Sequence, residues 1–360
     1  MDNLTHTLFA LTLARTRLGR QGHGATAALV LASNAPDRDI VTAVGGGANY
    51  LALHRGPTHG PIGVLGLGLA AAVAVWAYGR RSARTPPGPT DDAHPRASFA
   101  ALLLLSVLGV SAHILMDMPT SYGTRLLSPF NWQWFSVDWM PIVDAYLLAV
   151  LGASLLFRRH SPAARRRQAS IALLMMVGDY GLRAAAHHTA ISRARDLFAA
   201  TPACVPAPAS AIMEVWPLPP AEHSEPRGER PSCLVDVAAL PTLVSPFRWR
   251  IVVRRSNAYQ IQELNLLARA SDRATTPVAE WPNEWSPAVF RAAATPAGRA
   301  FLGFARFPDA RVLPPSDGMT AVVLSDMRFA PGLWSVHGPT PTADRLAVTI
   351  RVEAYSPRGP

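Results

Sequence analysis

Two histidines, His54 and His59, bracket an arginine and a Gly-Pro turn directly before an apolar run over residues 62–78. A turn can aim both imidazoles at one point, and imidazole is a common metal ligand. Arg55 beside them offers a guanidinium group that can hold a phosphate or a carboxylate. The segment therefore predicts a site that holds a metal ion and grips an anion. The alternative is a loop at a membrane edge whose basic residues contact lipid headgroups.

His113 and Asp117 form a second candidate pair. Residues four apart on a helix lie on the same face, so the two side chains stack one above the other. A histidine and an aspartate at this spacing make a good half of a metal site with nitrogen and oxygen ligands. The alternative is a hydrogen bond between the two that satisfies a buried helix end.

Acidic residues supply further candidates. Asp37 and Asp39 stand two apart after Pro36, where they can chelate or bridge two cations, or form a solvated turn. Asp138 and Asp144 are plausible ligands, or groups that orient the histidines. An aspartate that no metal engages, such as Asp138, could act as a general base.

Oxygen and imidazole ligands without thiolates suit zinc, manganese or magnesium, and we expect one or two divalent ions, with zinc favoured. The metal-site candidates are His6, Asp37, Asp39, His54, His59, His113 and Asp117. His6 is the weakest of them, because a lone histidine in an apolar helix is usually a buried, hydrogen-bonded residue. Such a centre most often activates water for hydrolysis of an ester or phosphoester. The catalytic candidates beside it are Asp138, Arg55 and Arg125.

Other enzyme classes lack their motifs in this sequence. It has no His-Glu-x-x-His of a zincin protease, no Gly-x-Ser-x-Gly elbow and no phosphate-binding P-loop. The two cysteines, Cys204 and Cys233, do not form a CxxC pair, which argues against a cysteine zinc site. They could form a disulfide if that part of the chain lies outside the cytoplasm.

The candidate residues stand at the ends of apolar runs that predict a polytopic helical bundle. The six candidate helices cover residues 3–18, 24–36, 62–78, 98–116, 141–157 and 168–188. The last four are convincing spans, whereas the first two fall below the roughly 20 residues that a free-standing spanning helix needs. The fold class is therefore a mainly α membrane protein.

The connections between these helices alternate in charge. Three of them carry twelve arginines: Arg15, Arg17, Arg20, Arg80, Arg81, Arg84, Arg96, Arg158, Arg159, Arg165, Arg166 and Arg167. The opposite connections, 37–61 and 117–140, carry only Arg38, Arg55 and Arg125. The positive-inside rule puts the twelve in the cytoplasm, and nearly all the site candidates then gather on the outer side. This topology also explains the net charge of +10 without a nucleic-acid partner.

Beyond the bundle (1–195) the sequence predicts a proline-rich linker (196–232) and a β-rich extracytoplasmic domain (233–360). Residues 201–231 contain eight prolines, a composition typical of a linker. The expected strands are 234–240, 247–255, 258–267, 300–307, 319–329 and 346–354. Within the bundle, Asp179 and Arg183 are four apart and predict an internal ion pair.

Six motifs follow one another along the chain: Met1-Asp-Asn-Leu-Thr-His6, Asn34-Ala-Pro-Asp-Arg-Asp39, His54-Arg-Gly-Pro-Thr-His59, His113-Ile-Leu-Met-Asp117, Thr120-Ser-Tyr-Gly-Thr-Arg125 and Val137-Asp-Trp139. Together they resemble the motifs of the YdjM-like family of bacterial inner-membrane proteins. The likeness covers roughly residues 1–190 and extends into the downstream domain through Ser245-Pro-Phe-Arg-Trp249. The resemblance implies a membrane-bound, metal-dependent hydrolase whose metal-site positions are the candidates given above together with Asp138. A distant similarity of that family to helical zinc phospholipases C and P1-type nucleases favours phosphoester cleavage.

We therefore expect a multi-pass inner-membrane hydrolase, with the site and the C-terminal domain extracytoplasmic. Its partners would be membrane lipids and a lipid-linked ester or phosphoester substrate. The rival expectation is a non-catalytic membrane protein, either a transporter or a structural or assembly factor, in which the His and Asp groups are structural. A transporter tends to place ionisable groups near mid-membrane at broken helices. Most of these groups stand at one edge instead, which favours the enzyme.

Overall fold

The computed structural model describes residues 1–82, 95–157, 161–204, 212–216, 233–256, 258–268, 279–282, 286–329 and 347–353. The chain divides into two compact units. The first comprises Met1–Val41 and Leu53–Ala184, and the second comprises Thr42–Ala52 and Ala185–Pro360. The division falls inside the long helix α7, so this helix contributes residues to both units.

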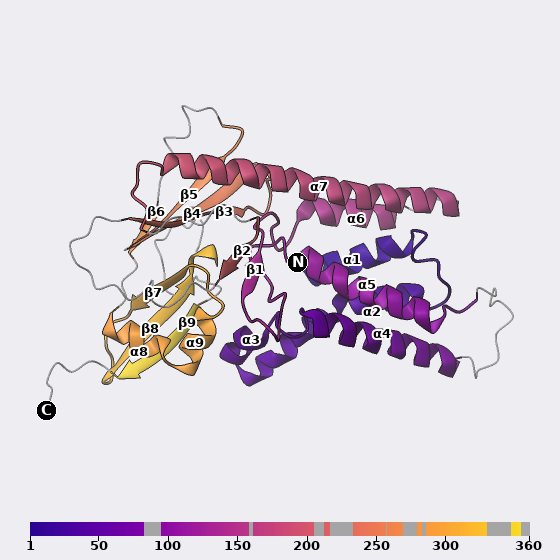
Figure 1. Ribbon diagram of the computed structural model, residues 1–360, viewed down its shortest axis with the longest axis horizontal. Coiled ribbons are helices and arrows are strands. Elements are labelled where there is room, and N and C mark those ends of the chain that lie inside the picture. The colour runs from indigo at the N-terminus through magenta and orange to yellow at the C-terminus, as the bar shows by residue number, and fades with distance from the viewer. Residues whose placement is uncertain are drawn as a thin grey trace. The chain divides into compact units, whose positions relative to one another are not determined.

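The N-terminal part of the chain is helical, as the apolar runs predict (Figure 1). Its elements are α1 (Asn3–Ala14), α2 (Ala25–Asn34), a 3-10 helix (Pro36–Gly45), α3 (Gly47–Leu53), α4 (Pro61–Ser82), α5 (Phe99–Asp117), β1 (Trp134–Ser136), α6 (Ala145–Leu156) and α7 (Pro162–Leu197). Side-chain caps define several of the helix starts. Asp2 caps α1 by accepting from the Thr5 N–H, and Ser98 caps α5 in the same way through the Ala101 N–H.

Two expected helices have different limits in the structure. Residues 141–144 precede α6, because Asp144 caps the helix by accepting from the N–H groups of Tyr146 and Leu147. The resulting helix has 12 residues, below the length of a straightforward span. Conversely, α7 runs for 36 residues, well beyond the expected segment 168–188.

Three helices in the described part of the chain are long and apolar enough to cross a membrane: Pro61–Arg81, Phe99–Asp117 and Pro162–Leu197. Helix α6 is apolar but shorter. The expected helical N-terminal region is thus confirmed, and its described residues contain three candidate membrane spans where four convincing spans were expected. The arginines at 84, 158 and 159 used in the topology lie outside the described residues.

Small residues let the helices of the first unit approach closely. A Cβ added to Gly109 of α5 would lie 2.9 Å from the Cβ of Ala32 and 3.2 Å from the main-chain nitrogen of Ser33, both in α2. On another face of α5, Val107 occupies the space beside Gly68 of α4. Such contacts are typical of membrane helices, where packing drives association. Helix α5 therefore packs against both α2 and α4.

The C-terminal part of the chain is rich in strands, as expected. Its elements are β2 (Glu214–Trp216), β3 (Leu234–Pro241), β4 (Arg248–Arg255), β5 (Ala258–Asn265), β6 (Ala279–Pro282), α8 (Pro287–Ala293), α9 (Pro296–Leu302), β7 (Pro308–Val312), β8 (Met319–Asp326), a 3-10 helix (Met327–Phe329) and β9 (Ala347–Glu353). Strands β3–β6 form one antiparallel sheet and β7–β9 form another, each in sequence order.

Alternation along the strands gives the first sheet two apolar faces. One face, with Trp249 and Ile251, packs against Ala186, Ala190 and Ala194 of α7. The other face packs against Phe307 and Met327. The last turns of α7 thus form part of the core of the second unit.

One expected strand is wrong. Residues 300–307 begin within α9, which Thr295 caps by accepting from the Gly298 N–H, with Pro296 at its first position. The sequence Thr-Pro is a helix-start signal, and it outweighs the short apolar run that suggested a strand. The chain leaves α9 at Leu302 and enters β7 only at Pro308.

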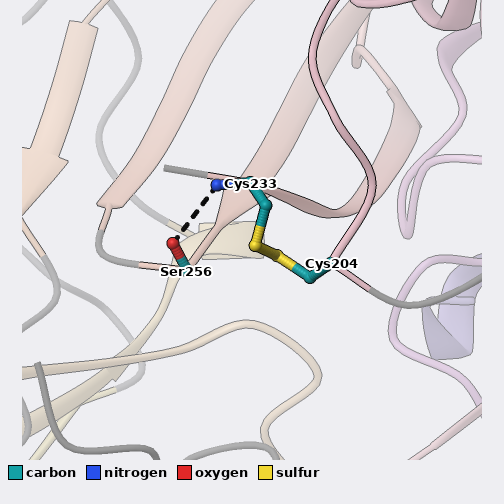
Figure 2. The surroundings of a disulfide bond; sticks show 3 residues. All are labelled: Cys204, Cys233 and Ser256. Carbon is teal, nitrogen blue, oxygen red and sulfur yellow. Dashed lines mark hydrogen bonds between the residues drawn. A yellow bond between two sulfur atoms is a disulfide. The ribbon is translucent and has the colours of Figure 1, made fainter. Parts of the chain in front are cut away.

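Cys204 and Cys233 form a disulfide, which the sequence left open (Figure 2). It fastens the segment around Ala203 to the beginning of β3, where Ala203 pairs in parallel with Leu234. The Cys233 N–H donates to the Ser256 hydroxyl nearby (Figure 2). Much of the expected linker, residues 205–211 and 217–232, lies outside the described residues, and β2 stands between these two stretches.

Candidate metal centre

Asp39 organises the loop that carries the two bracketing histidines. One of its carboxylate oxygens lies 2.8 Å from Nδ1 of His54. The other accepts from the Arg55 main-chain N–H at 2.7 Å and from the Thr58 hydroxyl at 3.1 Å. These contacts hold Arg55 in the left-handed region, at φ 51°, which a non-glycine residue adopts only at a cost. The carboxylate therefore shapes the turn that the sequence predicted.

His59 and His113 are oriented so that the Nε2 atoms of both rings meet. Nδ1 of His59 lies 2.9 Å from the Thr58 hydroxyl, and Nδ1 of His113 lies 2.8 Å from the main-chain oxygen of Ser33. A carbonyl only accepts, so Nδ1 of His113 carries the proton and its Nε2 carries the lone pair. The two Nε2 atoms are 3.3 Å apart.

Two carboxylates complete a cluster of four donor groups with these imidazoles. The donor atoms of Asp37, His59, His113 and Asp117 all lie within 4.8 Å of one another. Oδ2 of Asp117 is 3.4 Å from Nε2 of each histidine. Oδ1 of Asp37 is 3.5 Å from Nε2 of His113 and 3.9 Å from Nε2 of His59.

These spacings fit a divalent metal. Ligand bonds of about 2.0–2.1 Å in a tetrahedral zinc site put neighbouring donor atoms roughly 3.3–3.4 Å apart. Three of the donor–donor distances, among His59, His113 and Asp117, are 3.3–3.4 Å, and Asp37 is slightly farther away. Two lone-pair nitrogens and two carboxylates packed this closely repel one another unless a cation lies between them. Four of the expected His and Asp residues thus form a cluster that could hold a divalent ion.

Arg55 lies directly beside the cluster. Its Nη2 is 3.1 Å from Oδ2 of Asp117, and its Nη1 donates to the main-chain oxygen of Gly123 at 2.9 Å. The guanidinium also lies over the Tyr122 ring, 4.7 Å from its centroid. Its positive charge offsets part of the negative charge of the two carboxylates.

His6 is buried beside the same cluster. Its ring stacks on that of His113 with centroids 3.9 Å apart, and its Nε2 lies 3.3 Å from Oδ1 of Asp117. The nitrogen of Met1 contacts that same carboxylate oxygen. Helix α1 therefore brings His6 within reach of the cluster, next to one of the four donors rather than among them.

The surroundings keep two of the donors, His59 and Asp37, in the ionisation states that metal binding needs. Burial, together with the neighbouring His113 imidazole and the positive charge of Arg55, lowers the pKa of His59 well below its usual value. Burial alone would raise the pKa of Asp37, but the neighbouring His113 imidazole and the positive charge of Arg55 outweigh that effect and lower it. At neutral pH His59 is neutral and Asp37 is ionised, as ligands must be.

A family of known proteins matches the part of the chain that carries this cluster. Residues 1–190, more than half of the chain, match the YdjM inner membrane protein family. The chain belongs to this family. The match confirms the resemblance suggested by the motifs, and it spans every residue of the four-donor cluster.

One curated relative is similar over part of its length. It is the uncharacterized protein YfhP of Bacillus subtilis (strain 168), which is 26% identical over 155 residues. The aligned region covers 41% of this chain and 43% of the relative, so the chain spans less than half of that protein. No solved structure matches the chain.

Several predicted site residues of this YdjM family member lie outside the four-donor cluster. Asp39 and His54 bond to one another in the loop. Asp138 is buried, has a left-handed backbone at φ 58°, and accepts a hydrogen bond from the Ser136 hydroxyl at 3.3 Å. Their assignment as metal ligands or as a general base stays a prediction.

Arg125 is tied to the same loop through its main chain, since its N–H donates to the Arg55 carbonyl at 3.1 Å. Its guanidinium carbon lies 4.6 Å from the ring centroid of Trp134 and 5.2 Å from that of Trp132. Burial lowers the pKa of Arg125 to about 10, which leaves it charged at neutral pH. A buried positive group between aromatic rings is suited to an anion or to a structural cation–π role.

Asp144 and Arg183 form a separate buried group. Arg183 pairs with Asp144 and lies 3.5 Å from Asp179, which confirms the expected ion pair and adds a third member. Asp144, a candidate ligand by sequence, is instead the cap of α6 and the partner of Arg183.

Sequence reasoning missed the residues that orient the histidines. Ser33 acts through its main-chain oxygen, which no sequence pattern distinguishes. Thr58 stands directly before His59, and a hydroxyl residue next to a candidate ligand was an available signal.

Proposed function

We propose that this protein is a membrane-bound metal-dependent hydrolase that acts on a phosphoester or lipid-linked ester at the outer face of the inner membrane. The observation that carries the proposal is the cluster of two imidazoles and two carboxylates at metal-ligand spacing, with an arginine in contact with it. Asp37, His59, His113 and Asp117 would hold the ion. When bound, a divalent ion supplies Lewis-acid chemistry that activates water at neutral pH.

The chain's own residues would position the substrate and neutralise its negative charge. Arg55, in contact with Asp117, would bind an anionic oxygen of the substrate and stabilise the charge that develops on it. Arg125 is a second cationic group of the same region, linked to Arg55 by a main-chain hydrogen bond. Asp138 would accept the proton of the attacking water on a carboxylate oxygen.

Two observations support the proposed outer location. The candidate ligands stand at the helix ends opposite the arginine-rich connections, which the positive-inside rule puts in the cytoplasm. The disulfide between Cys204 and Cys233 belongs to the second unit, and disulfides persist in oxidising compartments outside the cytoplasm.

The first experiment is elemental analysis of the full-length protein purified in detergent, with three variants. His59→Ala and His113→Ala each remove one donor, and His188→Ala removes an exposed imidazole elsewhere on α7 as the matched control. We expect stoichiometric zinc or manganese in the wild type and in the control, and loss of at least tenfold in the two cluster variants. If the wild-type protein stays metal-free after incubation with divalent ions, the hydrolase proposal is rejected and the non-catalytic alternative remains.

The second experiment tests the reaction itself. Metal-loaded protein is assayed on a chromogenic phosphodiester, bis(p-nitrophenyl) phosphate, and on a carboxylic ester, p-nitrophenyl acetate. Hydrolysis of the phosphodiester that is abolished in His113→Ala and reduced at least tenfold in Arg55→Gln supports phosphoester chemistry. Metal binding without hydrolysis of either substrate would retain the site and reject the proposed classes of reaction.

A further inference from the structure

An open surface cavity of about 440 Å³ lies between the chain that follows α1 and the beginning of α7, and most of its lining residues are exposed. Its lining includes the guanidinium-bearing residues Arg17, Arg166 and Arg167 and the hydroxyl residues Thr16 and Ser170. All of these residues belong to the first unit, so the cavity does not depend on how the two units are placed. It is also separate from the metal centre, since α1 begins near His6 and ends before Thr16.

The lining of this arginine cavity is positively charged. It contains three arginines and no aspartate or glutamate. Within the described ranges of the chain, none of the three guanidinium groups has a carboxylate partner, whereas buried arginines such as Arg55 and Arg183 do. Three arginines in the lining of one cavity suit a phosphate group, which guanidinium groups can bind through paired hydrogen bonds.

The start of α7 also favours an anion in the cavity. Ala163, in the first turn of this 36-residue helix, lines the cavity, and Ser161 caps the turn by accepting from the Ala164 N–H. Free N–H groups and the helix dipole make a helix start favourable for an anion. This contribution supplements the three arginines and does not define the site alone.

The surface beside the cavity is apolar, and this favours a lipid over a soluble phosphate as the ligand. Residues 163, 167, 170, 174 and 177 lie on one face of α7, because each follows the previous one by three or four positions. That face passes from the cavity to Leu174 and Val177, which are 70% and 68% exposed. Leu18, also in the lining, is 49% exposed. The acyl chains of a lipid whose phosphate is held in the cavity can therefore contact the neighbouring apolar surface of α7.

We propose that the arginine cavity binds the phosphate headgroup of an anionic membrane lipid, with the acyl chains along the exposed face of α7. Basic cavities between membrane helices at the cytoplasmic side are favourable places for such headgroups. The site would anchor the arginine-rich end of the bundle in a leaflet that contains anionic lipid. This inference does not depend on the metal centre or on hydrolysis.

The test uses full-length protein in detergent micelles, titrated with phosphatidylglycerol or with phosphatidylcholine of the same acyl chains. The thermal unfolding midpoint reports binding and yields an apparent Kd. We expect saturable stabilisation by phosphatidylglycerol and none by phosphatidylcholine. The variant Arg17→Gln/Arg166→Gln/Arg167→Gln should weaken binding at least tenfold, and Arg17→Lys/Arg166→Lys/Arg167→Lys should keep it within a few-fold.

The matched control is Arg80→Gln/Arg81→Gln/Arg96→Gln, which removes the same charge from arginines that do not line the cavity. Binding within about twofold of wild type in this control supports a defined site. Equal weakening in the two glutamine variants would overturn it in favour of general charge attraction. Glycerol 3-phosphate or inorganic phosphate that stabilises as well as the lipid at equal concentration would overturn the lipid assignment. No response to phosphatidylglycerol would overturn the whole proposal.

Discussion

Nδ1 of His113 lies 2.8 Å from the main-chain oxygen of Ser33, so the backbone of α2 fixes the ring of a candidate ligand on α5. This contact keeps the proton on Nδ1 and directs the Nε2 lone pair toward the other donors. The distance between α2 and α5 therefore controls the geometry of the cluster. That distance is short because Gly109 has no side chain at the crossing point.

Gly109→Ala should weaken metal binding without touching any ligand. The new Cβ would lie 2.9 Å from the Cβ of Ala32 and 3.1 Å from the main-chain oxygen of Leu29, so the helices must separate. We expect metal affinity to fall at least tenfold, measured by competition with a chelating dye. Gly178→Ala is the matched control, because its Cβ would meet nothing within 4 Å. Equal affinity in the two variants would contradict the role of the helix contact.

Asp39→Asn should impair the loop while leaving the four-donor cluster in place. An amide offers one acceptor where the carboxylate serves His54, the Arg55 N–H and the Thr58 hydroxyl. We expect metal stoichiometry to be retained and affinity to fall about 10- to 100-fold, as for other groups that orient ligands. Asp37→Asn, which alters a donor, should instead lower the stoichiometry. Complete loss of metal from the Asp39 variant, under conditions where the protein stays folded, would show that Asp39 is itself a ligand.

The sequence predicted the helices and the side chains that could meet, but not which of them form the cluster. The apolar runs located α4 and α5, and the spacing of His113 and Asp117 gave one half of the site. The other half depends on loop contacts that no period encodes: Asp39 accepts three hydrogen bonds, and Arg55 takes a left-handed backbone. Asp39 and Asp37 stand two apart and look equivalent in the sequence. Only the folded loop shows that Asp39 orients its neighbours whereas Asp37 belongs to the four-donor cluster.

In the second unit, the sequence pattern predicted the strands that bury side chains on both faces. It failed at the segment where a capping residue starts a helix. The strands β3, β4 and β5 were all found because their β-branched and aromatic residues alternate between two apolar faces. Residues 300–302 belong to a helix instead, because Thr295 and Pro296 start α9 just upstream. The disulfide could not be assigned from the sequence, because its formation depends on whether this part of the chain lies outside the cytoplasm.

Arg183→Met should destabilise the bundle strongly, because it leaves Asp144 and Asp179 without their positive partner. Removing one member of a buried ion pair typically costs about 3–5 kcal/mol. Adding Asp144→Asn should recover a large part of this loss, since an amide oxygen can still cap the N–H groups at the start of α6. Thermal unfolding in detergent measures both effects. Arg195→Met, at an exposed position of the same helix, is the control, and equal destabilisation there would contradict the ion-pair explanation.

The disulfide offers a test of both compartment and stability. In protein from cells that are precipitated with acid and dissolved in denaturant, a maleimide of high mass should not shift the protein unless a reductant is added first, because both thiols are bonded. Free thiols in untreated cells would contradict the proposed outer location, since cytoplasmic cysteines stay reduced. Cys204→Ser/Cys233→Ser should lower the stability of the second unit by about 3–4 kcal/mol, the usual effect of opening a loop of this length. Metal content should stay unchanged, because all four donors of the cluster belong to the first unit.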